Sequence, residues 1–380
     1  MSTTFESGGP GPGHGAEVVP FPARLPAGPE PDTPDTPAGA DLDDDPATAP
    51  AVPAPRRPAG QHGELRPVIP GHLPGGQHGS VAGTRCGGSE VVVKLRSTFP
   101  LGRLRVRRSG YGAMQLAGPW AVNPPADQAS AIDLLRAAIT AGIDHIDTAQ
   151  YYGPDLVNEL IREALHPYPP ELAIVSKVAV GSDAAGSVIP HDDPRQLRQG
   201  IEANLRSLRV GQLAAVNLRL PGDGRVDARF DDQLAAMVRA RDEGLIAGVG
   251  LSNVSLGQLR HAADGTEIAC VQNLFHLADR SATPVLQECI RRDIAFVPFC
   301  PLGLPRGAAN PVLTSPAVIQ TADRLGVTPP QVALQWLLQL APNILLIPGT
   351  ASVAHLLDNL AAEDVVLDDQ ALRQLDGVSG

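Results

Sequence analysis

A carboxylate, two phenols and an amine occupy two neighbouring runs of the sequence. The run "GIDHIDTAQYYGP" contains Asp147, Tyr151 and Tyr152, and the run "AIVSKVAV" contains Lys177. The chain has four tyrosines, and only two of its 30 basic residues are lysine, so a lysine inside an apolar run is unusual here. If both runs end buried parallel strands, these side chains meet at one edge of a sheet.

Such a group can work as a proton donor. A free tyrosine has a pKa near 10, and a neighbouring ammonium is expected to stabilise its phenolate and lower that pKa. Asp147 would hold Lys177 in place and balance its charge. The alternative is a buried ion pair between Lys177 and Asp147 beside a packed tyrosine, which would have no role in catalysis.

A fourth candidate is Arg219, which ends the run "LAAVNLR" (213–219). A guanidinium stays charged near neutral pH, so Arg219 cannot act as an acid or base, but it can donate hydrogen bonds to a carbonyl or a phenolate. Its alternative role is an ion pair with Asp223 or Asp227.

The elements that must position these residues are short apolar runs in alternation with amphipathic segments. The runs are rich in Val and Ile, as strands buried on both faces should be. They cover 110–114, 143–147, 172–178, 213–219, 246–251, 268–272, 294–299 and 344–348.

The helical patterns between these strands carry start and stop signals. Asp193 with Pro194 predicts a helix start, Pro154 predicts another, and Gly142 predicts a helix end. Ile132, Leu135 and Ile139 are predicted to share one face of the first helix.

Eight strand–helix units over about 285 residues predict an α/β fold, the (β/α)8 barrel. The competing architecture is a doubly wound sheet, but "GYGAMQLAG" lacks the G-x-G-x-x-G fingerprint of such a fold. The stretch "FPLGRLRVRRSGYG" predicts a short N-terminal hairpin that plugs the lower end of the barrel. In a barrel, active residues lie at the carboxyl ends of the strands.

The first 95 residues have a different composition. Pro and Gly fill 33 of these positions, and no apolar periodicity is visible. We expect a disordered extension over 1–95 and the barrel over 97–380. A second hypothesis is that translation starts near residues 90–102, at a non-AUG codon ahead of Met114.

Composition narrows the range of partners and compartments. A formal charge of −11 argues against nucleic acid and anionic membranes as partners. No apolar run reaches the roughly 18 residues of a membrane span, and no signal-peptide pattern begins the chain. Four cysteines without CxxC spacing, Cys86, Cys270, Cys289 and Cys300, favour free thiols in the cytoplasm. The oligomeric state is left open.

From residue 97 to 378 the sequence resembles the aldo-keto reductase superfamily. The motifs "GIDHIDTAQYYG", "IVSKV", "GVGLSN", "VQNLF", "PFCPLG" and "IPGTASVAHLLDN" occur in the expected order. Within that superfamily, "GYGAMQLAGP" and "VNLR" are most similar to bacterial pyridoxal reductases.

The resemblance implies reduction of a small-molecule carbonyl substrate, most closely pyridoxal to pyridoxine, by hydride transfer from NADPH, with no metal. It gives Tyr152 the role of proton donor, with Asp147 and Lys177 beside it. Most relatives have histidine where this chain has Arg219, and the pyridoxal reductase group shares the arginine, which suits the phenolic oxygen of pyridoxal. Trp120 and Tyr151 are expected to line the substrate pocket. Two alternatives remain: a general aldehyde or ketone reductase, and a non-catalytic NADPH-sensing subunit.

The same resemblance implies a set of cofactor-binding residues at the strand ends and after the last strand. Ser252, Asn253 and Gln272 would bind the nicotinamide carboxamide, and Phe299 would stack on its ring. NADPH preference is expected even though relatives often carry Lys at Gly349 and Arg at His355. The whole expected set is Ala113, Met114, Ser252, Asn253, Gln272, Phe299, Pro301, Leu302, Gly349, Thr350, Ser352, His355, Asp358 and Asn359.

Overall fold

The computed structural model describes residues 97–118, 127–182, 188–304 and 310–378. The extension predicted over 1–95 lies outside these ranges, as does Trp120. Both therefore stay predictions.

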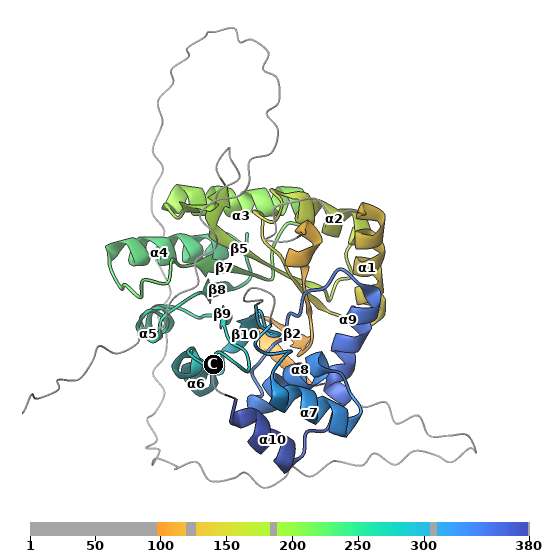
Figure 1. The fold of residues 1–380 in the computed structure, drawn as a ribbon. Coiled ribbons are helices and arrows are strands. Elements are labelled where there is room, and N and C mark those ends of the chain that lie inside the picture. The colour runs from red at the N-terminus through yellow and green to blue at the C-terminus, as the bar shows by residue number, and fades with distance from the viewer. Residues whose placement is uncertain (1–96, 119–126, 183–187, 305–309, 379–380) are drawn as a thin grey trace, which may run out of the picture. The chain divides into compact units, whose positions relative to one another are not determined.

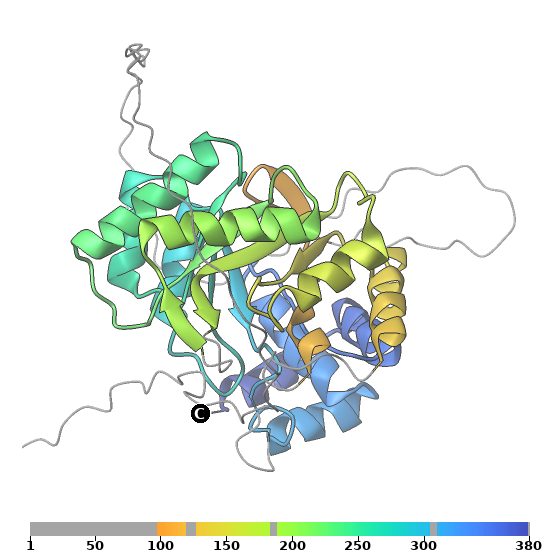
Figure 2. The same cartoon turned by 90° about the horizontal axis from the view of Figure 1, so that it is seen from above.

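The centre of the fold is a curled parallel sheet wrapped by helices (Figures 1 and 2). Seven strands pair in parallel in the order β10–β9–β8–β7–β5–β4–β3. Their bounds are β3 Tyr111–Gly112, β4 His145–Asp147, β5 Ala173–Ser182, β7 Ala215–Arg219, β8 Val249–Ser252, β9 Cys270–Leu274 and β10 Ala295–Phe299. The predicted strands are present, most of them shorter than expected.

The eighth predicted strand, 344–348, is not a regular strand but still joins the two edges of the sheet. It forms parallel bridges from Ile344 to Phe296 and from Leu346 to Ser109. The backbone N–H of Leu345 donates to the Phe296 carbonyl at 2.9 Å, and that of Gly110 donates to the Leu346 carbonyl at 2.8 Å. The sheet is thereby closed, and the predicted α/β barrel is confirmed.

Strand β5 is longer than predicted because its last residues leave the barrel. They pair antiparallel with β6 (Val188–His191), a hairpin that the sequence did not indicate. Lys177 therefore lies within β5, two residues past the partner of Asp147, and pairs with Asn217 of β7.

The helices form the outer layer (Figure 2). Their bounds are α1 Gln128–Thr140, α2 Leu156–Leu165, α3 Pro194–Leu208, α4 Ala228–Asp242, α5 Leu256–Gly265, α6 Thr283–Arg292, α7 Pro316–Leu325, α8 Pro329–Leu340, α9 Val353–Leu360 and α10 Asp369–Asp376, with 3-10 turns η1 Ala113–Ala117 and η3 Ala361–Asp364.

Two of the three predicted helix ends are confirmed. Asp193 caps α3 with a capping box, and Gly142 follows the end of α1 with φ 91°. The start predicted at Pro154 is wrong, because Asp155 adopts a left-handed conformation (φ 63°) and α2 begins only at Leu156.

The buried face of α1 is also shifted from the prediction. Its buried side chains are Ala131, Leu134, Leu135 and Ala138, whereas Ile132 and Ile139 are only partly buried.

The N-terminal hairpin lies where the sequence predicts it. Strand β1 (Thr98–Leu101) pairs with β2 (Leu104–Arg107), and Phe99, Leu101 and Val106 are buried. They belong to one apolar cluster with the first residues of the barrel strands, among them Ala173 and Ala215. The hairpin thus fills the end of the barrel where the strands begin.

Arg108 links the segment 344–348, which closes the sheet, to the start of the sheet. Its Nε donates to the Ile344 carbonyl at 3.0 Å, and its Nη2 donates to the carbonyls of Leu338 and Ala341 at 2.7 and 2.5 Å. The last carbonyls of α8 carry partial negative charge and accept a cation readily.

Within the described ranges, no helix has both the length and the apolar character needed to cross a membrane.

Candidate active site

The predicted proton-donor group assembles at the carboxyl ends of the strands. Asp147 ends β4, and Lys177 lies on the adjacent strand β5. The Lys177 ammonium forms a buried ion pair with Asp147 and donates to the Thr148 carbonyl at 3.0 Å. The side chains of both residues are less than a tenth exposed, so solvent screens this pair little.

Tyr152 packs directly against this ion pair. The Lys177 Nζ lies 5.1 Å from the centroid of the Tyr152 ring. Tyr151 meets Tyr152 edge to face, with ring centroids 5.1 Å apart. Both tyrosines are buried. The structure therefore brings Asp147, Tyr151, Tyr152 and Lys177 together, as the sequence predicts.

The pKa of Tyr152 differs from the expectation. Burial of the hydroxyl raises its pKa well above the usual value of a tyrosine, the Asp147 carboxylate raises it further, and Arg219 opposes them. In the protein alone the net direction is thus opposite to the lowering expected beside an ammonium, because desolvation outweighs the cation that opposes it. A raised pKa keeps Tyr152 protonated at neutral pH, which is the form that can donate a proton.

Arg219 ends β7 beside Ser252 of β8. Its Nη1 donates to the Ser252 hydroxyl at 3.4 Å, and its guanidinium carbon lies 5.2 Å from the centre of the Phe299 ring.

The alternative role of Arg219, an ion pair with Asp223 or Asp227, is not found. Asp223 pairs with Arg225, and Asp227 caps helix α4. In the part of the chain that the structure describes, no carboxylate forms an ion pair with Arg219.

A buried hydrogen-bond network lies behind Asp147 and Lys177. The Thr148 hydroxyl donates to the Asn158 side chain at 2.9 Å, and Asn158 donates to Asn204 at 2.9 Å. The Ser176 hydroxyl donates to the same Asn204 oxygen at 2.6 Å. The network joins α2 and α3 to the backbone on either side of the site, since Thr148 follows Asp147 and Ser176 precedes Lys177.

Our sequence reasoning missed this network. The signal that could have found it is the placement of asparagines at otherwise apolar positions of two helices. Asn158 and Asn204 are both fully buried on the faces that α2 and α3 turn toward the sheet.

Gln272 has a partner that the sequence did not predict. It lies within β9, which continues to Leu274, and its amide donates to the second carboxylate oxygen of Asp147 at 2.8 Å. Its neighbour in the register is Ser252. The amide therefore lies between the proton-donor group and the residues expected to bind the cofactor.

The remaining residues of the expected nicotinamide site lie at or beside the strand ends. Ser252 ends β8, and Asn253 follows in a left-handed conformation (φ 58°) with its amide bonded to the Leu220 carbonyl at 3.1 Å. Phe299 ends β10 and presents a flat, half-buried ring, with Pro301 and Leu302 just after it. Ala113 and Met114 lie in η1, directly after β3.

The segment after the eighth strand leads into α9, whose N-terminus suits a phosphate. Ser352 caps α9, and its backbone N–H donates to the Thr350 hydroxyl at 3.0 Å. His355 is exposed in the first turn of the helix.

In this segment, Gly349 is the position at which an added side chain would disturb the backbone. It approaches β3 so closely that an added Cβ would lie 2.9 Å from the Gly112 carbonyl oxygen. That contact is too short without a backbone shift, so the lysine that many relatives carry there does not fit this backbone.

Asp358 and Asn359, two more residues of the expected cofactor set, also contribute to the fold. The Asp358 carboxylate accepts hydrogen bonds from Thr328 and Gln331 at 2.8 and 2.9 Å, which ties α9 to the start of α8. Asn359 is buried.

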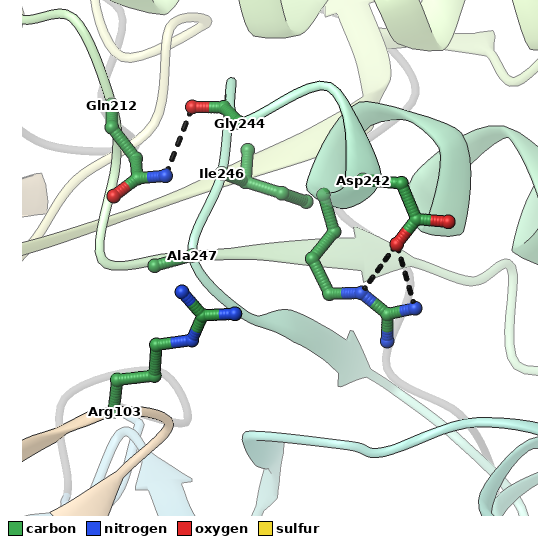
Figure 3. Close-up of a pocket in the computed structure, with 7 residues that line it drawn as sticks. Arg103, Gln212, Asp242, Gly244, Ile246 and Ala247 are labelled. Atoms are coloured by element: carbon green, nitrogen blue, oxygen red, sulfur yellow. Dashed lines mark hydrogen bonds and ion pairs between the residues drawn. The ribbon is translucent and has the colours of Figure 1, made fainter. Parts of the chain in front are cut away.

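A separate polar pocket opens at the plugged end of the barrel (Figure 3). Its lining includes Arg103 at the hairpin turn and Gln212, whose amide donates to the Gly244 carbonyl at 2.9 Å. Arg241 donates to Asp242 beside it. None of the predicted site residues lines this pocket, so it is distinct from the active-site end.

Among the described residues, no three His, Cys, Asp or Glu side chains are grouped so that they could hold a metal ion.

Comparison with known proteins identifies the relatives of this chain. The profile of the aldo/keto reductase family matches residues 109–379. Pyridoxine 4-dehydrogenase of Escherichia coli is 44% identical over 286 residues, which cover 74% of this chain and 98% of that protein. An uncharacterized oxidoreductase of Schizosaccharomyces pombe is 35% identical over 76% of this chain and 92% of its own length.

Solved structures that resemble this chain are also aldo-keto reductases. An aldo-keto reductase from Klebsiella pneumoniae crystallised with NADPH has a TM-score of 0.62 and 27% identity, and the match covers 74% of this chain and 95% of that one. A structure of aldo/keto reductase from the same organism with NADP and acetate has a TM-score of 0.61 and 28% identity over the same shares.

Proposed function

This chain belongs to the aldo/keto reductase family, and from that premise we propose that it reduces pyridoxal to pyridoxine with NADPH. The E. coli relative named pyridoxine 4-dehydrogenase supports the substrate, since the match spans nearly all of that protein. The Klebsiella structures with NADP and NADPH support the cofactor.

In the proposed reaction, Tyr152 is the proton donor. NADPH, when bound, supplies a hydride to the carbonyl carbon. The Tyr152 hydroxyl gives its proton to the carbonyl oxygen, and solvent later restores that proton. Lys177 stabilises the transient phenolate, and Asp147 holds Lys177 in place and balances its charge.

The observation that carries this proposal is the buried contact of Tyr152 with the Lys177–Asp147 pair. The tyrosine hydroxyl, the ammonium and the carboxylate of this contact together can donate a proton and stabilise the phenolate that remains. Perturbed groups gathered at the strand ends of a barrel are the usual mark of catalysis.

The residues at the strand ends also support the cofactor. Ser252 and Gln272 offer polar groups for a carboxamide, and Phe299 offers a ring on which a nicotinamide can stack. Ser352 and the free N–H groups of α9 would hold a phosphate. His355 would add a hydrogen bond to the 2′-phosphate of NADPH.

Replacement of Tyr152 by Phe tests the assignment. We expect turnover to fall by about 10²–10⁴-fold, as for a lost general acid, while NADPH binds as before. Steady-state rates with pyridoxal and simple aldehydes, against NADPH and NADH, measure turnover, and fluorescence titration measures cofactor binding. Turnover within threefold of the parent would refute the role of Tyr152.

The same panel of aldehydes separates the two other candidates. A general aldehyde reductase would turn over simple aldehydes as well as pyridoxal. A non-catalytic NADPH-sensing subunit would bind NADPH without turnover, but such a protein has no need of Asp147, Tyr152 and Lys177 together.

We further propose that the protein works in the reducing cytoplasm. Cys270, Cys289 and Cys300 are free thiols, and no disulfide joins any of the described residues.

A further inference from the structure

The charges of the candidate site do not balance. Lys177 is neutralised by Asp147 in a buried ion pair. Arg219 contributes a second positive charge, and the described residues hold no carboxylate paired with it. Among the described residues the site therefore carries one cation in excess, and partly buried cations are stable when an anion pairs with them.

The Arg219 guanidinium has unused hydrogen-bonding capacity. It carries five N–H donors, and one long bond, 3.4 Å to the Ser252 hydroxyl, is its only hydrogen bond within the described residues. The Phe299 ring supports one face of the group at 5.2 Å. A guanidinium that lies over a ring and has most of its N–H donors unbonded to the described residues is well arranged to bind an oxygen anion.

Arg219 lies beside the strand that carries Lys177. Leu218, which precedes Arg219, pairs with Val178, which follows Lys177, and the Lys177 Nζ lies 5.1 Å from the centroid of the Tyr152 ring. Consistent with this placement, Arg219 lowers the pKa of Tyr151 and that of Tyr152. A carbonyl oxygen that accepts the Tyr152 proton would therefore lie near Arg219 as well. An anionic oxygen bound by Arg219 must then be close to the carbonyl group of the same substrate.

We propose that Arg219 selects aldehydes that carry an ionised hydroxyl on the ring carbon adjacent to the aldehyde carbon. This inference rests on the proposed carbonyl reduction and extends it from one substrate to a chemical class, the ortho-hydroxy aromatic aldehydes. Arg219 binds the phenolate and moves no proton. The aldehyde gains a hydride from NADPH and a proton from Tyr152, and NADP⁺ leaves.

Two isomeric substrates test the position of the anion. In 2-hydroxy-5-nitrobenzaldehyde the phenolate is ortho to the aldehyde, and in 4-hydroxy-3-nitrobenzaldehyde it is para. The nitro group keeps both phenols ionised at neutral pH, and both phenolates conjugate with the carbonyl. Their intrinsic reactivities are thus matched, and chromatography of the alcohol products gives kcat/KM for each.

We expect the parent protein to prefer the ortho isomer by about tenfold or more, the effect of one charge-assisted hydrogen bond. Arg219→Met should bring the ortho-to-para ratio of kcat/KM close to one, and Arg219→Lys should restore part of it. The matched control is Arg225→Met, which removes an exposed arginine from the loop after the same strand and should leave the ratio as in the parent.

Two results would overturn the inference: a parent ratio near one, or a ratio that Arg219→Met leaves within about twofold of the parent. Circular dichroism and NADPH titration check that each variant folds. If Arg219→Met does not fold, the ortho-to-para ratios of kcat/KM of the parent and of Arg219→Lys still test the inference.

A binding measurement separates this inference from the proposed function. With NADP⁺ in place of NADPH no reduction occurs, and the absorbance shift of the nitrophenolate gives the dissociation constant of each isomer. Tighter binding of the ortho isomer that depends on Arg219 supports the inference, whether or not pyridoxal is reduced. If pyridoxal is not reduced, only the proposed substrate is refuted. Equal binding of both isomers with normal pyridoxal turnover contradicts the inference and leaves the proposed function intact.

Discussion

The Gln272 amide donates a hydrogen bond of 2.8 Å to Asp147. The other oxygen of the same carboxylate pairs with Lys177. Asp147 is thus held from two sides, by the ammonium that supports the proton donor and by an amide expected to face the nicotinamide. In the proposed reaction, cofactor binding and proton transfer would share this one carboxylate.

We predict that Gln272→Met weakens both functions. Loss of the amide removes a carboxamide contact and leaves one oxygen of a buried carboxylate without a partner, a cost of about 1–3 kcal/mol. The dissociation constant of NADPH should rise, and the single-turnover rate at saturating NADPH should fall several-fold. If Gln272 served the cofactor alone, only the dissociation constant would change.

The raised pKa of Tyr152 predicts the pH dependence of turnover. Reduction needs the protonated hydroxyl, so kcat should be level through neutral pH and decline only in alkali. Alcohol oxidation needs the phenolate, and its rate should rise with pH over the same range.

Two variants check the sign of this prediction. Asp147→Asn removes a charge that raises the pKa of Tyr152, so the alkaline decline should move to lower pH. Arg219→Met removes a charge that lowers it, and the decline should move to higher pH. A shift of both variants in the same direction would contradict this account.

Arg108 should be important for stability although it is far in sequence from its partners. Arg108→Met leaves three buried carbonyls without their donor, and we expect the free energy of unfolding to fall by ~3 kcal/mol. Denaturant unfolding measures this change. Arg105→Met is the matched control on the same hairpin, because Arg105 is exposed and makes only bonds of 3.4 Å, and its effect should stay within ~0.5 kcal/mol.

Cofactor preference should respond to position 355 and not to position 349. His355→Arg places a permanent cation in the first turn of α9, and we expect the NADPH-to-NADH affinity ratio to rise by about tenfold. Gly349→Lys should instead destabilise the fold, because its Cβ would meet the Gly112 carbonyl oxygen. Cofactor titration and thermal unfolding distinguish the two effects. A Gly349→Lys protein of unchanged melting temperature would show that this backbone can adjust.

The barrel could be predicted from sequence because its strands are short, apolar and regularly spaced. The strand ends at Asp147, Arg219 and Phe299 were placed to the residue, whereas β8 runs one residue past the predicted end, to Ser252. The start of α2 was missed because proline signals a helix start, whereas the left-handed Asp155 is bonded back to Gln150 in a turn that delays the helix.

Contacts between distant segments could not be predicted. The pairing of Gln272 with Asp147 spans 125 residues of sequence, and no local pattern encodes it. The pKa of Tyr152 depends on how deeply its hydroxyl is buried, which composition does not reveal. The Asn158–Asn204 bond likewise depends on the packing of two helices.

The plug formed by β1 and β2 gives the molecule a closed end and a reactive end. Chain that precedes Ser97 joins the fold at the closed end, while the predicted site residues gather at the other. A purification tag, surface anchor or second enzyme fused ahead of residue 97 would start on the side away from the substrate entrance. The protein could therefore be immobilised through its N-terminal side with the candidate active site facing the solution.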